Sequence, residues 1–205
     1  MVGSLILKAA LEDPKVSEVI SLLRSPRNTV HPKLKEVLIN DFEDYSQHST
    51  LFQNVEAAHF CIGVYTGQVN NKTFEKITVN YAVKFAEAVQ ANSPNARLCM
   101  LSGAGADRTE KSRTAFAKFK GRAENLIFNM DIDFYTFRPG YIYPVTPREE
   151  PNLMYKVSRA LYPVLKFMGK NLSIKSTELA RAMYHVGMHG TKLKVLENQD
   201  ILDLA

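Results

Sequence analysis

Three groups of polar residues in this sequence could do chemistry, and each is defined by its place relative to apolar runs. Ser102 directly follows a strand-like apolar run, where a hydroxyl can hold a ligand by a hydrogen bond. Lys120 lies four residues after Phe116 in a predicted helix, so the two side chains share one helical face. Arg24 and Arg27 follow another apolar run, and a guanidinium makes bidentate, charge-assisted contacts with phosphate. These residue types favour an anionic ligand.

The elements that must position these residues alternate short apolar strands with longer amphipathic helices. This alternation is typical of a parallel sheet covered on both faces, so we expect an α/β, Rossmann-like, doubly wound parallel sheet. The helix that begins near 177 should be capped by Ser176 or Thr177. Strands are expected at 18–23, 35–39, 57–62, 97–101, 133–137 and 193–196. Helices are expected at 4–11, 74–91, 112–128, 153–168 and 177–186, with a last turn from 199.

The order of these elements lacks a first strand. A doubly wound sheet normally begins with a strand that lies in its middle, whereas this chain begins with a predicted helix. Without that strand, the predicted strands at 18–23 and 57–62 lose their shared neighbour. Because unpaired buried backbone groups cost about 1–3 kcal/mol each, we expect the natural chain to start about a dozen residues earlier, with an apolar strand and a glycine turn.

Composition narrows the class of protein. The 205 residues predict one domain over 1–205, with a small substrate or cap region at about 140–205. No apolar run is long enough for a membrane span, and the dispersed basic residues behind the net charge of +5 argue against nucleic acid. Cys61 and Cys99 lie in apolar runs, which predicts reduced core thiols in a cytoplasmic protein.

Three motifs follow one another along the chain: Leu101-Ser102-Gly103-Ala104-Gly105-Ala106-Asp107, Phe116-Ala-Lys-Phe-Lys120-Gly121-Arg-Ala-Glu124 and Phe137-Arg138-Pro139-Gly140-Tyr141-Ile142. In this order they resemble the extended and atypical short-chain dehydrogenases/reductases, which are NAD(P)-binding Rossmann proteins. The likeness is nearest to the branch that includes the Tat-interacting oxidoreductases, and it covers nearly the whole chain to about Val186.

The resemblance implies a role for each of these positions around a bound dinucleotide. Ser102 and Lys120 would be catalytic, with Lys120 also on the ribose, and Arg24 and Arg27 would favour NADP over the alternative, NAD. The cofactor-binding set would be Gly3, Arg24, Arg27, Asp41, Ile62, Gly63, Ser102, Lys120, Pro139 and Ile142. The alternatives are an incidental helix-start glycine for Gly3, a solvated basic turn for the arginines, a turn former for Asp41 and a surface lysine for Lys120.

One position departs from the family pattern. Phe116 stands where the acid/base tyrosine of the family belongs, and phenylalanine has no proton to give. General acid–base catalysis contributes about 10²–10⁴-fold, so a slow reductase is expected unless Tyr65, Tyr141 or Tyr143 serves instead.

Two functions from different classes follow. The first is an oxidoreductase of low activity on an unknown small carbonyl substrate; the second is a non-catalytic dinucleotide-binding redox sensor or partner-binding module. His185 and His189 are better explained as a surface pair at a helix end than as a metal site, so no metal is expected. The apolar segment 161–168 predicts packing on the domain or a homodimer contact.

Overall fold

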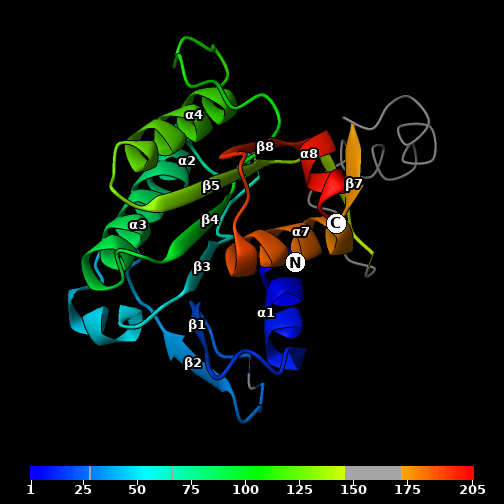
Figure 1. The fold of residues 1–205 in the computed structure, drawn as a ribbon. Helices are drawn as coiled ribbons and strands as arrows, with labels where there is room; N and C mark the ends of the chain where they lie inside the picture. The colour runs from blue at the N-terminus through cyan, green and yellow to red at the C-terminus, as the bar shows by residue number, and fades with distance from the viewer. Residues whose placement is uncertain (28, 66, 146–171) are drawn as a thin grey trace.

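Parallel strands form three separate sheets in the computed structural model, which describes residues 1–27, 29–65, 67–145 and 172–205 (Figure 1). The largest sheet has the order β3-β4-β5-β8, and two smaller sheets pair β1 with β2 and β6 with β7. The strands are β1 (Val19–Leu23), β2 (Leu34–Leu38), β3 (Ala57–Phe60), β4 (Arg97–Leu101), β5 (Asp133–Arg138), β6 (Tyr141–Tyr143), β7 (Ser173–Lys175) and β8 (Val195–Glu197).

Helices cover both faces of the four-stranded sheet (Figure 1). Side chains alternate across a strand, so Leu98 and Met100 of β4 enter one core while Cys99 enters the other. The first core is closed by α2 (Asn71–Glu75), η2 (Lys76–Asn80), α3 (Tyr81–Asn92) and α4 (Ala115–Phe128). The second is closed by α1 (Val2–Glu12), α7 (Ser176–His189) and α8 (Asn198–Asp203). This is the layered α/β architecture that the sequence predicted.

The sheet is interrupted between β1 and β3, at the place where the sequence predicted a missing neighbour. Along its length β1 pairs with β2, and β3 pairs with β4. Within the described ranges, no strand pairing joins β1 to β3. Leu22 and Val37 still pack against the first core, and Lys33 Nζ, next to β2, donates to the carbonyl of Asp13 at 2.7 Å. Side chains therefore attach the small sheet to the rest of the molecule.

The predicted elements match the structure closely, with four differences. The long helix expected at 74–91 contains a π-helical turn, η2, between α2 and α3. The cap predicted at Ser176 or Thr177 is wrong: Lys175 is the N-cap residue, and its N–H donates to Glu178 Oε2 at 2.9 Å. The sequence analysis missed a 3₁₀ helix, η1 (Ser46–Phe52), and the short strands β6 and β7. The helix predicted at 153–168 lies outside the described residues.

The described residues contain neither a membrane-spanning helix nor a metal-binding cluster of three or more side chains. In that part of the chain, no helix is long and apolar enough to cross a membrane. The same residues contain no group of three or more histidine, cysteine, aspartate or glutamate side chains placed to hold a metal ion. His185 and His189 are adjacent on α7, with ring centroids 4.9 Å apart.

Candidate functional site

The loops after β4 and β5 are hydrogen-bonded to each other at the carboxyl ends of their strands. The N–H of Ser102 donates to the carbonyl of Phe137 at 2.8 Å, and the N–H of Ala104 donates to that of Pro139 at 2.9 Å. In parallel α/β sheets, ligands bind outside the carboxyl ends of the strands. The two motifs that the sequence analysis singled out, around Ser102 and Pro139, therefore form one edge.

A buried carboxylate organises this edge. Glu124 of α4 is 0% exposed, and its Oε1 accepts hydrogen bonds from Ser102 Oγ at 2.7 Å, Thr136 Oγ1 at 3.0 Å and Arg138 Nε at 3.0 Å. A second N–H of Arg138 donates to Oε2. Arg138 also pairs with Glu197 at 3.0 Å, on the solvent side. The bidentate guanidinium compensates for burial of the carboxylate, and the pairing raises the pKa of Arg138.

Lys120 lies one helical turn before Glu124 on the same face of α4. Its ammonium donates to the carbonyl of Leu101 at 2.9 Å, next to Ser102. Burial lowers the pKa of Lys120 to about 8, while the charge of Glu124 acts in the opposite direction. The predicted pair, Ser102 and Lys120, is thus brought together at the end of β4.

Phe116 lies one turn earlier on this face, and its ring packs against Gly103. A Cβ built on Gly103 would lie 2.5 Å from Phe116 Cζ, the ring carbon that carries the hydroxyl in tyrosine. The ring carbon that would carry a tyrosine hydroxyl therefore lies against the backbone of Gly103. Position 116 supplies hydrocarbon to the site and no proton donor.

Gly121 allows the loop from 103 to 112 to cross α4. Its missing Cβ would lie only 1.9 Å from the carbonyl oxygen of Asp107, so no larger residue fits this crossing. The Asp107 N–H donates to the carbonyl of Ala117 at 2.9 Å, and the Asp107 carboxylate accepts from the N–H groups of Thr109 and Ser112. The close crossing of loop and helix therefore explains why a glycine follows Lys120 in the sequence motif.

The amino end of α1 and the loop after β1 approach each other, and both contain residues that the sequence analysis assigned to cofactor binding. Arg27 Nη1 donates to Ser4 Oγ, in the first turn of α1, at 3.0 Å. Gly3 packs closely on the end of β3, since a Cβ there would lie 3.3 Å from Cys61 Cβ. The first N–H groups of a helix have no partner within the helix and favour anions. This side of the sheet break therefore combines helix N–H groups with a guanidinium, and Arg24 is exposed nearby in sequence.

The other predicted cofactor residues have more ordinary surroundings. Asp41 is exposed and forms a turn, because its Oδ1 accepts from the N–H of Glu43 at 3.0 Å. Ile62 packs partly on the first core, whereas a Cβ on Gly63 would meet nothing within 4 Å, so open space adjoins that glycine. Ile142 pairs with Ile174 in the β6–β7 sheet.

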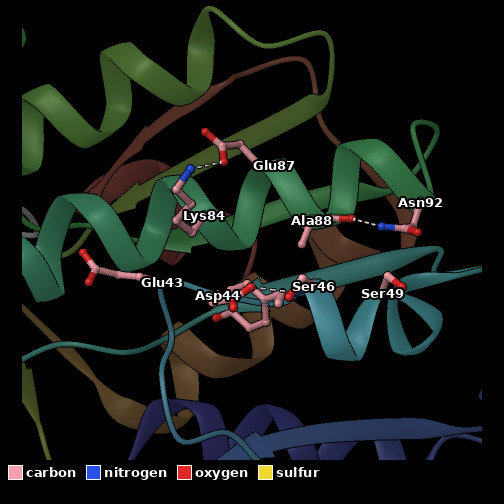
Figure 2. Close-up of a pocket in the computed structure, with 9 residues that line it drawn as sticks. Glu43, Asp44, Ser46, Ser49, Lys84, Glu87, Ala88 and Asn92 are labelled. Carbon is pink, nitrogen blue, oxygen red and sulfur yellow. Dashed lines mark hydrogen bonds and ion pairs between the residues drawn. The ribbon is translucent and has the colours of Figure 1, made fainter.

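One surface depression adjoins the loops after β4 and β5. It has a volume of about 290 Å³ and is lined by Ala104, Arg138, Glu197 and Asn198. A larger one, of about 330 Å³, lies between η1 and α3, and its charged lining is already paired internally, as in the Lys84–Glu87 contact at 2.7 Å (Figure 2). The smaller depression borders the Glu124 cluster through Arg138, and Ser102 and Lys120 are not among its lining residues.

Sequence reasoning missed the central role of Glu124. Its spacing of four from Lys120 was a usable signal, because it puts both residues on the face shared with Phe116. Thr136, buried in the middle of β5, and the contact between Arg27 and Ser4 carried no such signal, because both depend on the packing of distant segments.

No protein-family model and no curated protein matches the sequence. The fold, however, matches those of solved structures. A putative NAD-dependent epimerase/dehydratase from Bacillus halodurans matches with a TM-score of 0.64 and 14% identity over 100% of this chain and 95% of that chain. YIR035C, a short-chain dehydrogenase/reductase from Saccharomyces cerevisiae, matches with a TM-score of 0.66 and 14% identity over 99% and 94%. The fold is that of the short-chain dehydrogenases/reductases.

Other matching structures are longer than this chain. WbmH from Bordetella bronchiseptica, solved in complex with NAD+, matches with a TM-score of 0.67 and 16% identity over 92% of this chain and 68% of that chain. Against another match, gox2253, the chain spans 64% of the length of the solved protein. The narrower likeness to the Tat-interacting branch stays a prediction.

Proposed function

We propose that the chain binds a nicotinamide dinucleotide along the carboxyl ends of its strands, between the amino end of α1 and Lys120. The observation that carries this proposal is the position of the Lys120 ammonium, which hydrogen-bonds to Leu101 beside Ser102 at the end of β4. The donor sets fit the two ends of such a ligand. Helix N–H groups and Arg27 suit phosphate, and the ammonium of Lys120 suits ribose hydroxyls. The NAD+ complex of WbmH supports the same ligand class.

We further propose that NADP is preferred over NAD. The support is the pair Arg24 and Arg27 in the loop after β1, of which Arg27 already reaches the first turn of α1. A guanidinium recognises a 2′-phosphate by charge-assisted hydrogen bonds that contribute about 1.5–3 kcal/mol each. The free thiols Cys61 and Cys99 support a reducing compartment such as the cytoplasm.

The proposed chemistry is slow interconversion of a carbonyl and an alcohol, with a substrate region in the segment from about 140 onward. The bound nicotinamide would accept or supply the hydride. Lys120 would hold the cofactor, and Ser102 would contact the substrate. Because Phe116 cannot transfer a proton, the rate should fall by about the 10²–10⁴-fold that general acid–base catalysis contributes.

A non-catalytic dinucleotide-binding module is the second candidate function. Phe116 favours it, because a phenylalanine at the position of the acid/base tyrosine has no proton to transfer. In this case the dinucleotide would be a regulatory or folding ligand, and the surface that it orders would contact a partner.

Calorimetric titration of the full chain with NADPH and NADH tests the binding proposal. Lys120→Met should lower affinity for both about tenfold or more through loss of a charged hydrogen-bond donor, whereas Lys118→Met, on the same helix, should not. Arg27→Ala should weaken NADPH about 10–100-fold and leave NADH nearly unchanged. Equal affinity of Lys120→Met and the unmodified protein would overturn the placement, and tighter binding of NADH would overturn the NADP preference.

Phe116→Tyr separates the two candidate functions. If the chain is a degraded reductase, restoring the hydroxyl should raise NADPH-dependent reduction of a broad panel of aldehydes and ketones. The gain should be about the 10²–10⁴-fold that general acid–base catalysis contributes. Unchanged, negligible turnover in a variant that still binds NADPH would favour the binding module.

A further inference from the structure

Two histidines lie side by side on the exposed face of α7 at its carboxyl end. His185 and His189 are four residues apart, so they are one turn apart on the same face of the helix. Both side chains are exposed. Within the described ranges, neither imidazole has a hydrogen bond or an ion pair, and their one ring contact is with each other. Their nitrogens are therefore open to an outside partner.

The backbone beneath the two rings is held by bonds that a free helix end lacks. The last four carbonyls of a helix have no partner within it. Here the Arg97 guanidinium donates to the carbonyls of Gly187 and Met188, at 3.4 and 3.1 Å. The Gly190 N–H donates to the carbonyl of Val186 at 2.7 Å. The last turn of α7 is thus fixed, and a ligand that needs the one-turn spacing does not have to order a frayed end.

The separation of the two rings matches that of two imidazoles bound to one metal ion. Zinc–nitrogen bonds are about 2.0–2.1 Å long, so the centroid of a bound imidazole lies about 3.2 Å from the metal. Two such rings at a ligand–metal–ligand angle of about 90–110° have centroids about 4.5–5.2 Å apart. The rings of His185 and His189 have centroids 4.9 Å apart and planes inclined by 56°. Inclined rings can turn their edges, which carry the nitrogens, toward one ion.

We infer that His185 and His189 together bind one divalent transition-metal ion, with Cu²⁺ preferred over Zn²⁺ and Ni²⁺. Imidazole suits these metals, and Cu²⁺ binds a given nitrogen site more strongly than either neighbour in the series. Mg²⁺ and Ca²⁺ prefer oxygen ligands and are excluded. The partial negative charge at the carboxyl end of a helix also favours a cation. Spacing alone favoured a plain surface pair, because it shows neither the ring separation nor the fixed helix end.

This metal site is separate from the edge proposed for the dinucleotide. Arg97 is the first residue of β4 and contacts the end of α7, whereas Ser102 follows the last residue of the same strand. The histidine pair therefore lies at the amino end of β4 and the candidate site at its carboxyl end. Binding of the metal does not depend on the proposed function.

Calorimetric titration of the untagged full chain with copper(II) chloride tests the site. The unmodified chain should bind one Cu²⁺ at this pair. His185→Gln and His189→Gln should each lower its affinity about tenfold or more, because a second ligand on the same helix binds as an intramolecular step and its loss leaves one-point attachment. His48→Gln, which removes a single imidazole from η1, is the matched control and should leave the affinity unchanged.

A rescue variant makes the result specific to the one-turn pair. Arg181→His in the His189→Gln chain places a new histidine one turn before His185 on the same exposed face, and it should restore the affinity. Paramagnetic Cu²⁺ should broaden the amide ¹⁵N–¹H signals of His185 and His189 before those of His48. An unchanged affinity in His185→Gln, an equal loss in His48→Gln, failure of the rescue, or Mg²⁺ binding as tight as that of Cu²⁺ would overturn the inference.

Discussion

Replacing Gly121 by alanine should destabilise the protein, although alanine is the better helix former. The new Cβ would lie 1.9 Å from the carbonyl oxygen of Asp107 and 2.7 Å from the N of Arg108. Real Cβ atoms essentially never approach other atoms within 3.0 Å, so the loop would have to retreat by more than an ångström. Backbone is in the way here, so a change of side-chain rotamer cannot relieve the overlap.

The size of the effect follows from what holds the loop on α4. Asp107 N–H donates to the Ala117 carbonyl at 2.9 Å, Arg108 Nε to Asn125 Oδ1 at 2.9 Å, and Asn125 Nδ2 to the Arg108 carbonyl at 2.8 Å. Losing three such bonds costs about 1.5–4.5 kcal/mol, and the helix propensity of alanine over glycine returns about 1 kcal/mol. The free energy of unfolding should therefore fall by about 0.5–3.5 kcal/mol.

Urea unfolding followed by circular dichroism measures this difference. Gly63→Ala is the matched control, because a Cβ there meets nothing within 4 Å, and its effect should stay within about 0.5 kcal/mol. A Gly121→Ala protein as stable as the unmodified one, or more stable, would refute the close crossing of loop and helix.

Three further predictions concern single residues. Burial lowers the pKa of His59 to about 4, below its usual 6.5, so only the unfolded chain takes up this proton as the pH falls from about 6.5 to 4. The free energy of unfolding should fall by up to about 3 kcal/mol over that window, and by less in His59→Gln. Equal losses in the two proteins would show that His59 also takes up the proton in the folded state. Glu124→Gln should lower the free energy of unfolding in urea by about 3 kcal/mol, because it breaks a buried ion pair with Arg138. Glu197→Gln breaks the exposed pair with the same arginine and should cost less than about 1 kcal/mol. Similar costs for the two variants would contradict the claim that burial makes the Glu124 pair the more important one. Asn70→Ala should lower the free energy of unfolding, measured by thermal unfolding, by about 1 kcal/mol, because Asn70 Oδ1 accepts from the Thr73 N–H at 2.9 Å at the start of α2. An unchanged stability would show that this cap contributes nothing.

The strands and long helices were predictable because hydrophobic periodicity reports burial directly. In β4, Leu98, Cys99 and Met100 are all buried, as expected for a strand covered on both faces. The interruption between β1 and β3 was also predictable, because it follows from element order alone. The short strands β6 and β7 were not, since three residues with partners far along the chain leave no periodic pattern.

The candidate site was predictable as a set of positions but not as a network. The order of motifs placed Ser102, Lys120 and Pro139 at neighbouring strand ends, and the structure brings them to one edge. The hydrogen bond of Ser102 to Glu124 could not be predicted, because Glu124 also accepts from Thr136 and Arg138 of another strand. Such a bond depends on the third and fourth partners of a cluster, which spacing along a chain does not specify.

The interrupted sheet also affects how the molecule opens locally. Backbone hydrogen bonds normally make neighbouring strands exchange their amide hydrogens as one cooperative unit, but β1 and β2 share such bonds only with each other among the described residues. A two-stranded sheet has little stability of its own, so β1 and β2 should form a unit that opens before the four-stranded sheet does. Arg27 belongs to this unit and Lys120 to the other. A dinucleotide bound as proposed would join the two units, and ligand concentration would then set how far the opening of one depends on the other.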